Sequence, residues 1–213
     1  MSIKVNLLNI KSTLPENVTL VAVSKTKPIS DLIEAYDAGQ RIFGENKIQE
    51  MAEKWEELPK DIQWHMIGHV QTNKVKFMAP FVSLIHGVDS LKLLLEINKQ
   101  AKKNNRTIDC LLQMHIAEEE TKFGLDEKEL ENLLQSEEFK QLNNINIVGL
   151  MGMATFTENQ SQIKKEFTHL KAIFDAKHKL KTKIFNLESL SMGMSGDYQL
   201  AIEYKNTMVR IGS

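Results

Sequence analysis

The chain has 213 residues, of which 42% are hydrophobic and 26% charged, and its formal net charge is −1 at pH 7. This composition is typical of a globular protein, and the balanced charge argues against nucleic acid as a partner. The single cysteine, Cys110, has no partner for an internal disulfide and stands in an apolar run, so we expect it in the core. No run approaches the roughly 20 apolar residues of a membrane helix, and the first segment, MSIKVNLLNI, lacks the apolar region of a secretory signal. We therefore expect a cytoplasmic protein that does not enter the membrane.

Short apolar runs rich in Val and Ile alternate along the chain with amphipathic segments. The eight runs are VTLVAV from Val18, RIF from Arg41, IQWHMI from Ile62, FVSLIH from Phe81, TIDCLLQMHI from Thr107, INIVGLM from Ile145, KIFNLE from Lys183 and TMVRI from Thr207. Runs of this kind, separated by helices, predict parallel βα units.

Between the runs, apolar residues recur at helical spacing. The stripes are Ile48, Met51, Ala52 and Trp55; Ile163, Phe167, Leu170 and Phe174; Leu32, Ile33 and Tyr36; Leu91, Leu94 and Leu95; and Leu130, Leu133 and Leu134. Gly39 is a suitable end for the third stripe. The polar segment AEEETKFGLDEKELE, from Ala117, is expected to be a loop that runs into a helix, either as a mobile lid or as a solvated charged face.

These units predict an α/β fold, a (β/α)₈ barrel that forms a single domain over residues 1–213. The length is short for a fold that usually takes about 250 residues. A doubly wound open sheet is the structural alternative, but the chain has no G-x-G-x-x-G after the first strand and no G-x-x-x-x-G-K-[ST]. In a parallel barrel, the functional face lies where the strands end and the βα loops begin.

The first strand runs directly into two lysines, Lys25 and Lys27. A lysine amine is a nucleophile only when it is deprotonated, and burial or a neighbouring cation lowers its pKa. Lys25 is therefore a candidate for covalent chemistry, and an ordinary solvated lysine at a strand end is the alternative. We expect Lys25 to point into the barrel mouth and Lys27 to leave with the turn before Pro28.

Other strand ends carry weaker signals. Glu45 or Asn46 follows the second strand, where a helix cap is an equally simple interpretation. His65 and His69 have a spacing that metal sites use, but no third ligand stands nearby in the sequence, which argues against a metal. The segment GLMGM, which contains Met151, is expected to line a flat apolar ligand or to pack in the core.

The C-terminal third predicts an anion site. The segment SMGMSGD, Ser191 to Asp197, is expected to be a Ser/Gly loop that opens a helix, whose N–H groups and dipole favour an anion. The final VRIGS places Arg210 at the end of the eighth strand, with Gly212 and Ser213 beyond it. Barrels often bind phosphate in the loops after strands seven and eight. A phosphate anchor that faces a lysine suits an aldehyde-bearing phosphorylated cofactor, and pyridoxal phosphate (PLP) fits that description.

Seven segments carry a resemblance to a known family. In chain order they are VAVSKTKP, FGENKIQE, WHMIGHVQTNK, AEEETKFG, GLMGM, LSMGMSGD and TMVRIGS. Their order is typical of the pyridoxal phosphate homeostasis protein family, also called the YggS or PROSC family, and the resemblance extends from about Val18 to the last residue. It implies a barrel like that of alanine racemase, and a role in intracellular PLP homeostasis, by buffering or delivery of PLP, without catalytic turnover.

The resemblance also implies roles for individual residues. Lys25 matches the lysine that forms a reversible Schiff base with PLP, and Arg210 matches the arginine that faces the pyridine nitrogen. Lys122 matches a second motif lysine, with a transfer or regulatory contact. The remaining matches are Ser195, Gly212 and Ser213 at the phosphate, and Asn46, His65 and Met151 near the cofactor. The chain departs from the family at His115 and near Thr155, and it stops at Ser213, where family members usually continue.

The arginine favours a carrier over an enzyme. A guanidinium stays protonated and acts only as a donor, so a pyridine nitrogen that faces it stays unprotonated and the ring is a weaker electron sink. The main alternative is a PLP-dependent fold-type III enzyme such as an amino-acid racemase, although Tyr36, Tyr198 and Tyr204 fall in or beside predicted helices. A third possibility is a barrel for another phosphate ligand, with Lys25 as an ion-pairing residue. The expected partners are PLP and PLP-dependent apoenzymes, for a monomer or weak dimer.

Overall fold

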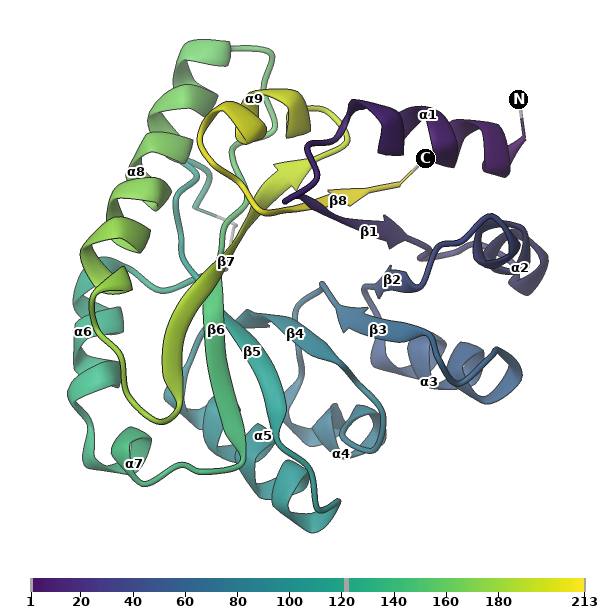
Figure 1. Cartoon of the computed structure of the whole chain (residues 1–213). Coiled ribbons are helices and arrows are strands. Elements are labelled where there is room, and N and C mark those ends of the chain that lie inside the picture. Colours follow the sequence, from purple (N-terminus) through teal and green to yellow (C-terminus); the bar gives the residue numbers. More distant parts are fainter. Residues whose placement is uncertain (1, 121–122, 213) are drawn as a thin grey trace.

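Eight parallel strands pair in chain order and close into a barrel in the computed structural model, which describes residues 2–120 and 123–212 (Figure 1). The strands are β1 (Thr19–Val23), β2 (Ile42–Glu45), β3 (Gln63–Met66), β4 (Leu84–Val88), β5 (Ile108–Gln113), β6 (Ile145–Met151), β7 (Phe185–Met194) and β8 (Met208–Ile211). Pairing of β8 with β1 closes the sheet, with Val21 opposite Arg210. Each predicted strand is confirmed, and so is the predicted (β/α)₈ barrel.

The helices lie around the outside of the strands (Figure 1). They are α1 (Ile3–Thr13), α2 (Ile29–Asp37), α3 (Ile48–Glu57), α4 (Val75–Met78), α5 (Leu91–Lys103), α6 (Glu127–Gln135), α7 (Glu137–Lys140), α8 (Gln160–His178) and α9 (Tyr198–Glu203), with a 3₁₀ turn, η1, at Thr72–Lys74. The predicted apolar stripes fall in α2, α3, α5, α6 and α8. Helix α1 precedes the first strand and was not predicted. It lies beside the end of β8 (Figure 1), and residues of α1 line one pocket together with Ile211.

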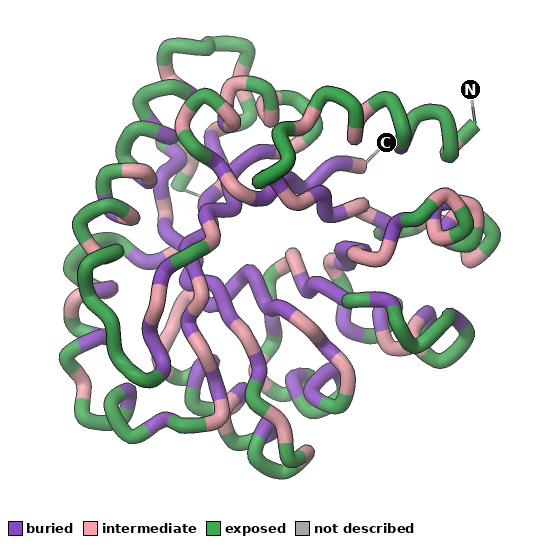
Figure 2. The backbone as a smooth tube through the Cα atoms, in the orientation of Figure 1, coloured by how far each residue is buried: buried purple, intermediate pink, exposed green. Residues whose placement is uncertain are grey.

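Two apolar layers hold the barrel together, and Figure 2 shows the buried residues concentrated along the strands. The outer layer lies between strands and helices and contains the largest buried side chains, among them Trp64, Phe43 and Phe167. A separate inner cluster consists of Val21, Leu84, Leu111, Met151 and Met208. Side chains alternate between the two faces of a strand, so membership of either layer shows which residues point into the barrel. Cys110 is fully buried in the outer layer, as predicted, and burial raises the pKa of its thiol.

One predicted loop is partly strand. Strand β7 extends through Met194, so Ser191–Met194, expected as part of a Ser/Gly loop, belongs to the sheet. The register of β7 shifts against both neighbours, between Ile147 and Gly149 on one side and between Ser191 and Gly193 on the other. Such irregularities lengthen a strand beyond what its apolar pattern indicates.

Candidate functional site

A cavity of about 690 Å³ opens at the carboxyl-terminal ends of the strands. We call it the mouth cavity. Its lining comes from the ends of β1, β5, β7 and β8, from the loops that follow β1, β2, β3, β5, β6, β7 and β8, and from Ile163 of α8, so residues far apart in the sequence share one space. Among the residues predicted for the site, Lys25, Asn46, Ser195, Arg210 and Gly212 line it.

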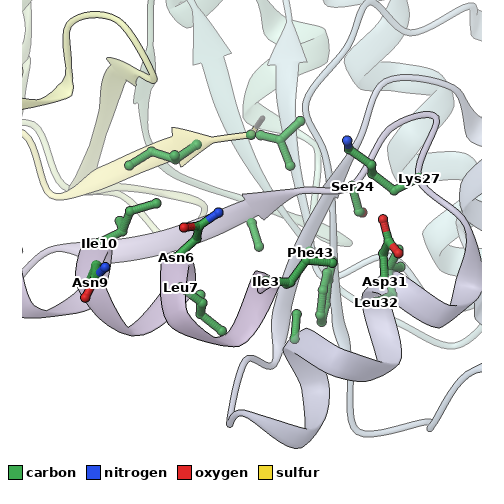
Figure 3. A pocket seen from close by; sticks show the side chains of 15 residues that line it. Ile3, Asn6, Leu7, Asn9, Ile10, Ser24, Lys27, Asp31, Leu32 and Phe43 are labelled. Atoms are coloured by element: carbon green, nitrogen blue, oxygen red, sulfur yellow. The ribbon is translucent and has the colours of Figure 1, made fainter. Parts of the chain in front are cut away.

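Lys25 and Lys27 take different directions, as predicted. Val21 belongs to the inner cluster, and alternation along β1 carries Val23 and then Lys25 to the same side, where both line the mouth cavity. Lys27 instead lines a second, smaller cavity of about 360 Å³ on the outside of the barrel, between α1, α2 and β1. Figure 3 shows Lys27 and Asp31 at one end of this outer cavity.

The residue before Lys25 is tied to a buried ion pair. The Nζ of Lys54 donates to the carbonyl oxygen of Ser24 at 2.6 Å, to Glu45 Oε1 at 2.6 Å and to Glu50 Oε1 at 2.8 Å. The hydroxyl of Ser24 also donates to Glu45 Oε1, at 2.7 Å. Ser24, Glu45 and Lys54 are all buried, at 4%, 0% and 5% exposure. The outward-facing side of the Lys25 turn is therefore held by a charged cluster that water hardly reaches.

The residue after Lys25 is tied to the same cluster. The backbone N–H of Thr26 donates to Glu50 Oε1 at 2.6 Å. Thr26 has a φ of 62°, in the left-handed region that a β-branched residue rarely adopts. The hydrogen bonds on both sides of Lys25 hold this turn in place, so the position of the lysine backbone is set by α3 and β2 and not by the turn alone.

The two carboxylates of this cluster have opposite pKa shifts. Burial raises the pKa of Glu45, and the hydrogen bonds from Lys54 and Ser24 offset this only in part. Its Oε2 is buried and has no hydrogen-bond partner among the described residues. Burial also acts to raise the pKa of Glu50, but the hydrogen bonds from Lys54 and the Thr26 N–H, together with the charge of Lys54, lower it below its ordinary value.

The wall of the mouth cavity beside the Lys25 turn is made by the loops after β7 and β8, because β8 pairs with β1. The Gly212 N–H donates to Ser195 Oγ at 3.1 Å, and the Ser195 hydroxyl donates back to the Gly212 carbonyl oxygen at 3.2 Å. A Cβ placed on Gly196, in the loop after β7, would meet nothing within 4 Å, so there is open space beside this residue. Ser213, predicted for the same site, lies outside the described residues.

A carboxylate closes the turn after β7. Asp197 accepts a hydrogen bond from the Met194 N–H at 2.6 Å. Burial raises the pKa of Asp197, against the opposing effects of that N–H and of the charge on Arg210. Helix α9, which begins at Tyr198, has only six residues. The predicted anion site therefore depends on the Ser195 and Gly212 loops and not on a long helix dipole.

Arg210 lies at the bottom of the mouth cavity with its guanidinium held from below. It is 4% exposed, and burial lowers its pKa to about 10. Its Nη1 donates to the hydroxyl of Ser191, and its Nη2 donates to the carbonyl oxygen of Gly152 at 3.2 Å. At neutral pH the group remains a cation with a fixed orientation.

His65 and Met151 lie beneath the mouth cavity and do not line it. Met151 is fully buried in the inner cluster. His65 points inward from β3, and its Nδ1 lies 3.0 Å from Nε2 of His86. Their predicted contact with a cofactor stays a prediction, which the lining of the cavity does not support. His86, inside the predicted strand FVSLIH, is a polar interior residue that sequence reasoning missed; it follows Leu84 of the inner cluster by two residues, and this spacing was the available signal.

The second histidine of the metal-like pair lies elsewhere. His69 lines the mouth cavity and stacks on Phe123, with ring centroids 3.9 Å apart and planes at 12°. The described residues contain no group of three or more His, Cys, Asp or Glu side chains placed to hold a metal ion.

The loop after β5 is tied to the loop after β6. The Phe156 N–H donates to Glu119 Oε1 at 2.7 Å, and the Glu118 N–H donates to Thr155 Oγ1 at 3.0 Å. Phe123 and Phe156, which both line the mouth cavity, are 50% and 94% exposed. The predicted lid thus forms one rim of the cavity; its mobility stays a prediction, and Lys122 lies outside the described residues.

The fold and the mouth cavity define the class of this protein. Over residues 1–213, the chain matches the family model of the alanine racemase N-terminal domain. It is 39% identical over 197 residues to the pyridoxal phosphate homeostasis protein of Aquifex aeolicus, with 91% of this chain and 84% of the relative covered. It is 36% identical over 203 residues to the protein of that name in Escherichia coli K12, with 93% and 85% covered. The chain therefore belongs to the pyridoxal phosphate homeostasis protein family, as its sequence motifs indicate.

Solved structures agree with this assignment. PipY of Synechococcus elongatus, without PLP, superposes with a TM-score of 0.91 at 34% identity and covers 99% of this chain and 98% of its own. The same protein with PLP bound gives 0.89 at 33% identity, with the same shares covered. Alanine racemase of Bartonella henselae, with covalently bound pyridoxal phosphate, gives 0.75 at 19% identity over 98% of this chain and 59% of its own, which shows a common fold.

Proposed function

We propose that this chain binds PLP in the mouth cavity and takes part in intracellular PLP homeostasis. Lys25 would hold the cofactor through a reversible Schiff base and release it without catalytic turnover. The observation that carries this proposal is that Lys25 and the linked Ser195 and Gly212 loops line one cavity of about 690 Å³. The family name and the PLP-bound PipY structure support the same ligand.

The donors of the mouth cavity fit this cofactor. A phosphorylated aromatic aldehyde needs an amine, an anion cradle and a group that faces the ring. Lys25 supplies the amine. The Ser195 and Gly212 loops, with open space beside Gly196, are the proposed place of the phosphate. The Ser195 hydroxyl and the Gly212 N–H, which bond to each other's loop in this structure, would turn to it as donors. Arg210 supplies a fixed guanidinium at the bottom. Asn46 also lines the cavity, and Ser213 is proposed at the phosphate from the family resemblance alone.

The covalent step needs no further reactant. The unprotonated Nζ of Lys25 adds to the aldehyde carbon, and loss of one water leaves a carbon–nitrogen double bond; addition of one water reverses the reaction. PLP supplies an electron sink when it is bound. What the chain contributes is the position of the amine, set by the hydrogen bonds on either side of Lys25, and the anion cradle in the loops after β7 and β8.

Two features support storage of PLP over turnover. The guanidinium of Arg210 stays protonated at neutral pH and only donates, so a ring nitrogen that accepts from it stays unprotonated, and carbanion chemistry is disfavoured. None of the described residues that line the mouth cavity is a tyrosine. Tyr36, for example, donates to Asp61 Oδ1 at 2.7 Å, away from the cavity.

Release of the cofactor implies a recipient. We propose that PLP passes to PLP-dependent apoenzymes in the cytoplasm, and that residues 1–213 act as a single PLP-binding domain, monomeric or weakly dimeric. No helix among the described residues has the length and apolar character to cross a membrane.

The proposal is tested by the absorbance spectrum of the purified protein with PLP, followed by borohydride reduction and mass spectrometry of its peptides. We expect a band near the visible edge and a mass increase on the peptide that contains Lys25. Lys25→Ala should lose both, whereas Lys27→Ala, whose side chain lines the outer cavity, should keep both. Equal PLP binding without Lys25, or amino-acid racemisation that depends on Lys25, would overturn the proposal.

A further inference from the structure

A file of hydrogen-bonded polar side chains runs through the barrel interior beneath the mouth cavity. His65 Nδ1 lies 3.0 Å from His86 Nε2, and His86 Nδ1 lies 3.3 Å from the hydroxyl oxygen of Ser191. That hydroxyl also accepts a hydrogen bond from Nη1 of Arg210. The four residues are buried, with exposures of 4%, 0%, 0% and 4% along the file. They come from β3, β4, β7 and β8, so only the closed barrel brings them together.

Arg210 fixes the direction of every hydrogen bond in this file. A guanidinium has only donors, so Ser191 Oγ accepts from it. Among the described residues, the acceptor within reach of the Ser191 hydroxyl is His86 Nδ1, at 3.3 Å, and a buried hydroxyl without an acceptor for its proton is costly. Nδ1 of His86 must therefore be the unprotonated nitrogen. Its proton lies on Nε2 and is donated to His65 Nδ1, so His65 in turn carries its proton on Nε2.

Both imidazoles are neutral in this arrangement. Burial lowers the pKa of His65 to about 3. Burial, with further contributions from His65 and Arg210, lowers the pKa of His86 well below its ordinary value. The charged group that acts on His86 is Arg210, which in turn interacts by charge with Asp197. Because neither histidine takes up a proton near neutral pH, the file keeps one set of tautomers.

We infer that His86 is a positioning residue for Arg210. As an acceptor at Nδ1, it turns the hydroxyl proton of Ser191 away from the guanidinium and leaves the lone pairs of Ser191 Oγ for Nη1. Together with the Gly152 carbonyl on Nη2, this holds the guanidinium in one orientation toward the mouth cavity. His65 selects the tautomer of His86. The effect of a fixed guanidinium on PLP binding rests on the proposed function. The assignment of the histidine tautomers does not, because it follows from the hydrogen bonds alone.

The first test needs no cofactor. In protein labelled with ¹⁵N-histidine, long-range ¹H–¹⁵N spectra report which ring nitrogen carries the proton, and His65→Asn and His86→Asn assign the two rings. We expect both rings to be protonated at Nε2 and to remain neutral from pH 8 to pH 5. His69, which lines the mouth cavity and is half-exposed, lies outside the file and serves as an internal reference for the spectra. A proton on Nδ1 of His86, or an imidazolium at pH 6, would overturn the inference.

The second test separates positioning from simple packing. His86→Asn places an acceptor oxygen near the position of Nδ1, whereas His86→Leu offers none. With PLP as the probe, we expect His86→Leu to lose about tenfold in affinity, about the effect of one hydrogen bond in a charged network, and to shift the absorbance band. His86→Asn should recover most of both. Equal losses in the two variants would point to packing and contradict the inference.

The outcomes distinguish this inference from the proposed function. If the wild-type protein binds no PLP, the proposed function fails. The NMR measurement of the tautomers of His65 and His86 then still tests the inference, because it needs no cofactor. If PLP binds through Lys25 but His86 is protonated at Nδ1, the function stands and the inference fails. If His86→Leu does not fold, Ser191→Ala replaces it as the test variant. Without the Ser191 hydroxyl, nothing selects the tautomer of His86, so the ¹⁵N chemical shifts of its ring nitrogens should change.

Discussion

The Nζ of Lys54 lies 2.6 Å from the carbonyl oxygen of Ser24, the residue immediately before Lys25. This contact connects a helix on the outside of the barrel to the lysine that points into its mouth. The same helix holds the other side of the turn, because Glu50 accepts a hydrogen bond from the N–H of Thr26, the residue that follows Lys25.

Removal of Lys54 should therefore cost both stability and cofactor attachment. In Lys54→Met the carboxylates of Glu45 and Glu50 lose their cation, and breaking a buried pair from one side costs about 3–5 kcal/mol. We expect a lower urea midpoint with an unchanged slope, together with slower imine formation at Lys25 in stopped-flow absorbance.

The matched control is Lys140→Met. Lys140 also pairs with a glutamate on its own helix, Glu137, at 3.0 Å, but both side chains are exposed, and exposed pairs add little. A second check adds Glu45→Gln to Lys54→Met. The added substitution removes the carboxylate charge that Lys54→Met leaves without a cation, so the urea midpoint of the double variant should rise part of the way back to the wild-type value. If Lys54→Met and Lys140→Met behave alike, the cluster does not hold the turn.

Gly68 sets the distance between β2 and β3 at the rim of the mouth cavity. A Cβ on Gly68 would lie 2.4 Å from the carbonyl oxygen and 2.8 Å from the Cα of Asn46. These are backbone atoms that cannot rotate away, so Gly68→Ala must displace the end of β2. We expect a loss of about 1–3 kcal/mol and weaker PLP binding, measured by urea denaturation and by titration. Gly196→Ala, where a Cβ meets nothing within 4 Å, should leave the urea midpoint unchanged; equal destabilisation by both variants would contradict the prediction.

Some of this architecture was readable from the sequence and some was not. The strands were predictable because parallel strands buried on both faces are short apolar runs, and the inward direction of Lys25 followed from its spacing along β1. Lys54 gave no signal, because on α3 it stands among other charged residues and its partners Ser24 and Glu45 belong to two other elements. Only the closed barrel identifies it as a buried cation.

The remaining differences also have physical causes. Helix α1 has one buried residue, Leu7, and a weak apolar stripe, so periodicity did not reveal it. The length of β7 depends on register shifts that no local pattern encodes. Ser191 was assigned to a loop because serine and glycine favour loops, but in the barrel its hydroxyl is the partner of Arg210.

The buried histidines should make the protein less stable below pH 6.5. Burial lowers the pKa of His65 to about 3 and that of His86 well below its ordinary value, whereas both titrate near 6.5 in the unfolded chain. Between these limits the unfolded state binds more protons, so the free energy of unfolding falls as the pH falls. Each histidine should cost about 1.4 kcal/mol at one pH unit below 6.5.

Urea denaturation at pH 7.5 and pH 5.5 measures this effect. The double variant His65→Asn, His86→Asn provides the comparison, since it keeps polar side chains but cannot titrate. Glu45, whose pKa burial raises, acts in the opposite direction and is common to both proteins, so the difference between their pH slopes belongs to the histidines. Equal slopes above pH 5 would mean that the histidines do not titrate as stated.

Ser195 should matter for the phosphate of the ligand and not for its aldehyde. Its hydroxyl links the loops after β7 and β8 through two hydrogen bonds with Gly212, on the wall of the cavity formed by β8, the neighbour of β1. Under the proposed function, Ser195→Ala loosens the anion cradle and removes one donor, so the affinity for PLP should fall about tenfold or more. Pyridoxal, which has the aldehyde and no phosphate, should bind both proteins equally weakly. Titration of each protein with each ligand, followed by absorbance, gives the four affinities. Lys25→Ala is the complementary variant, because it should abolish the absorbance band with both ligands. A Ser195→Ala protein that loses PLP and pyridoxal in the same proportion would place the serine at the aldehyde side of the cavity and refute the assignment of the phosphate to the β7 and β8 loops.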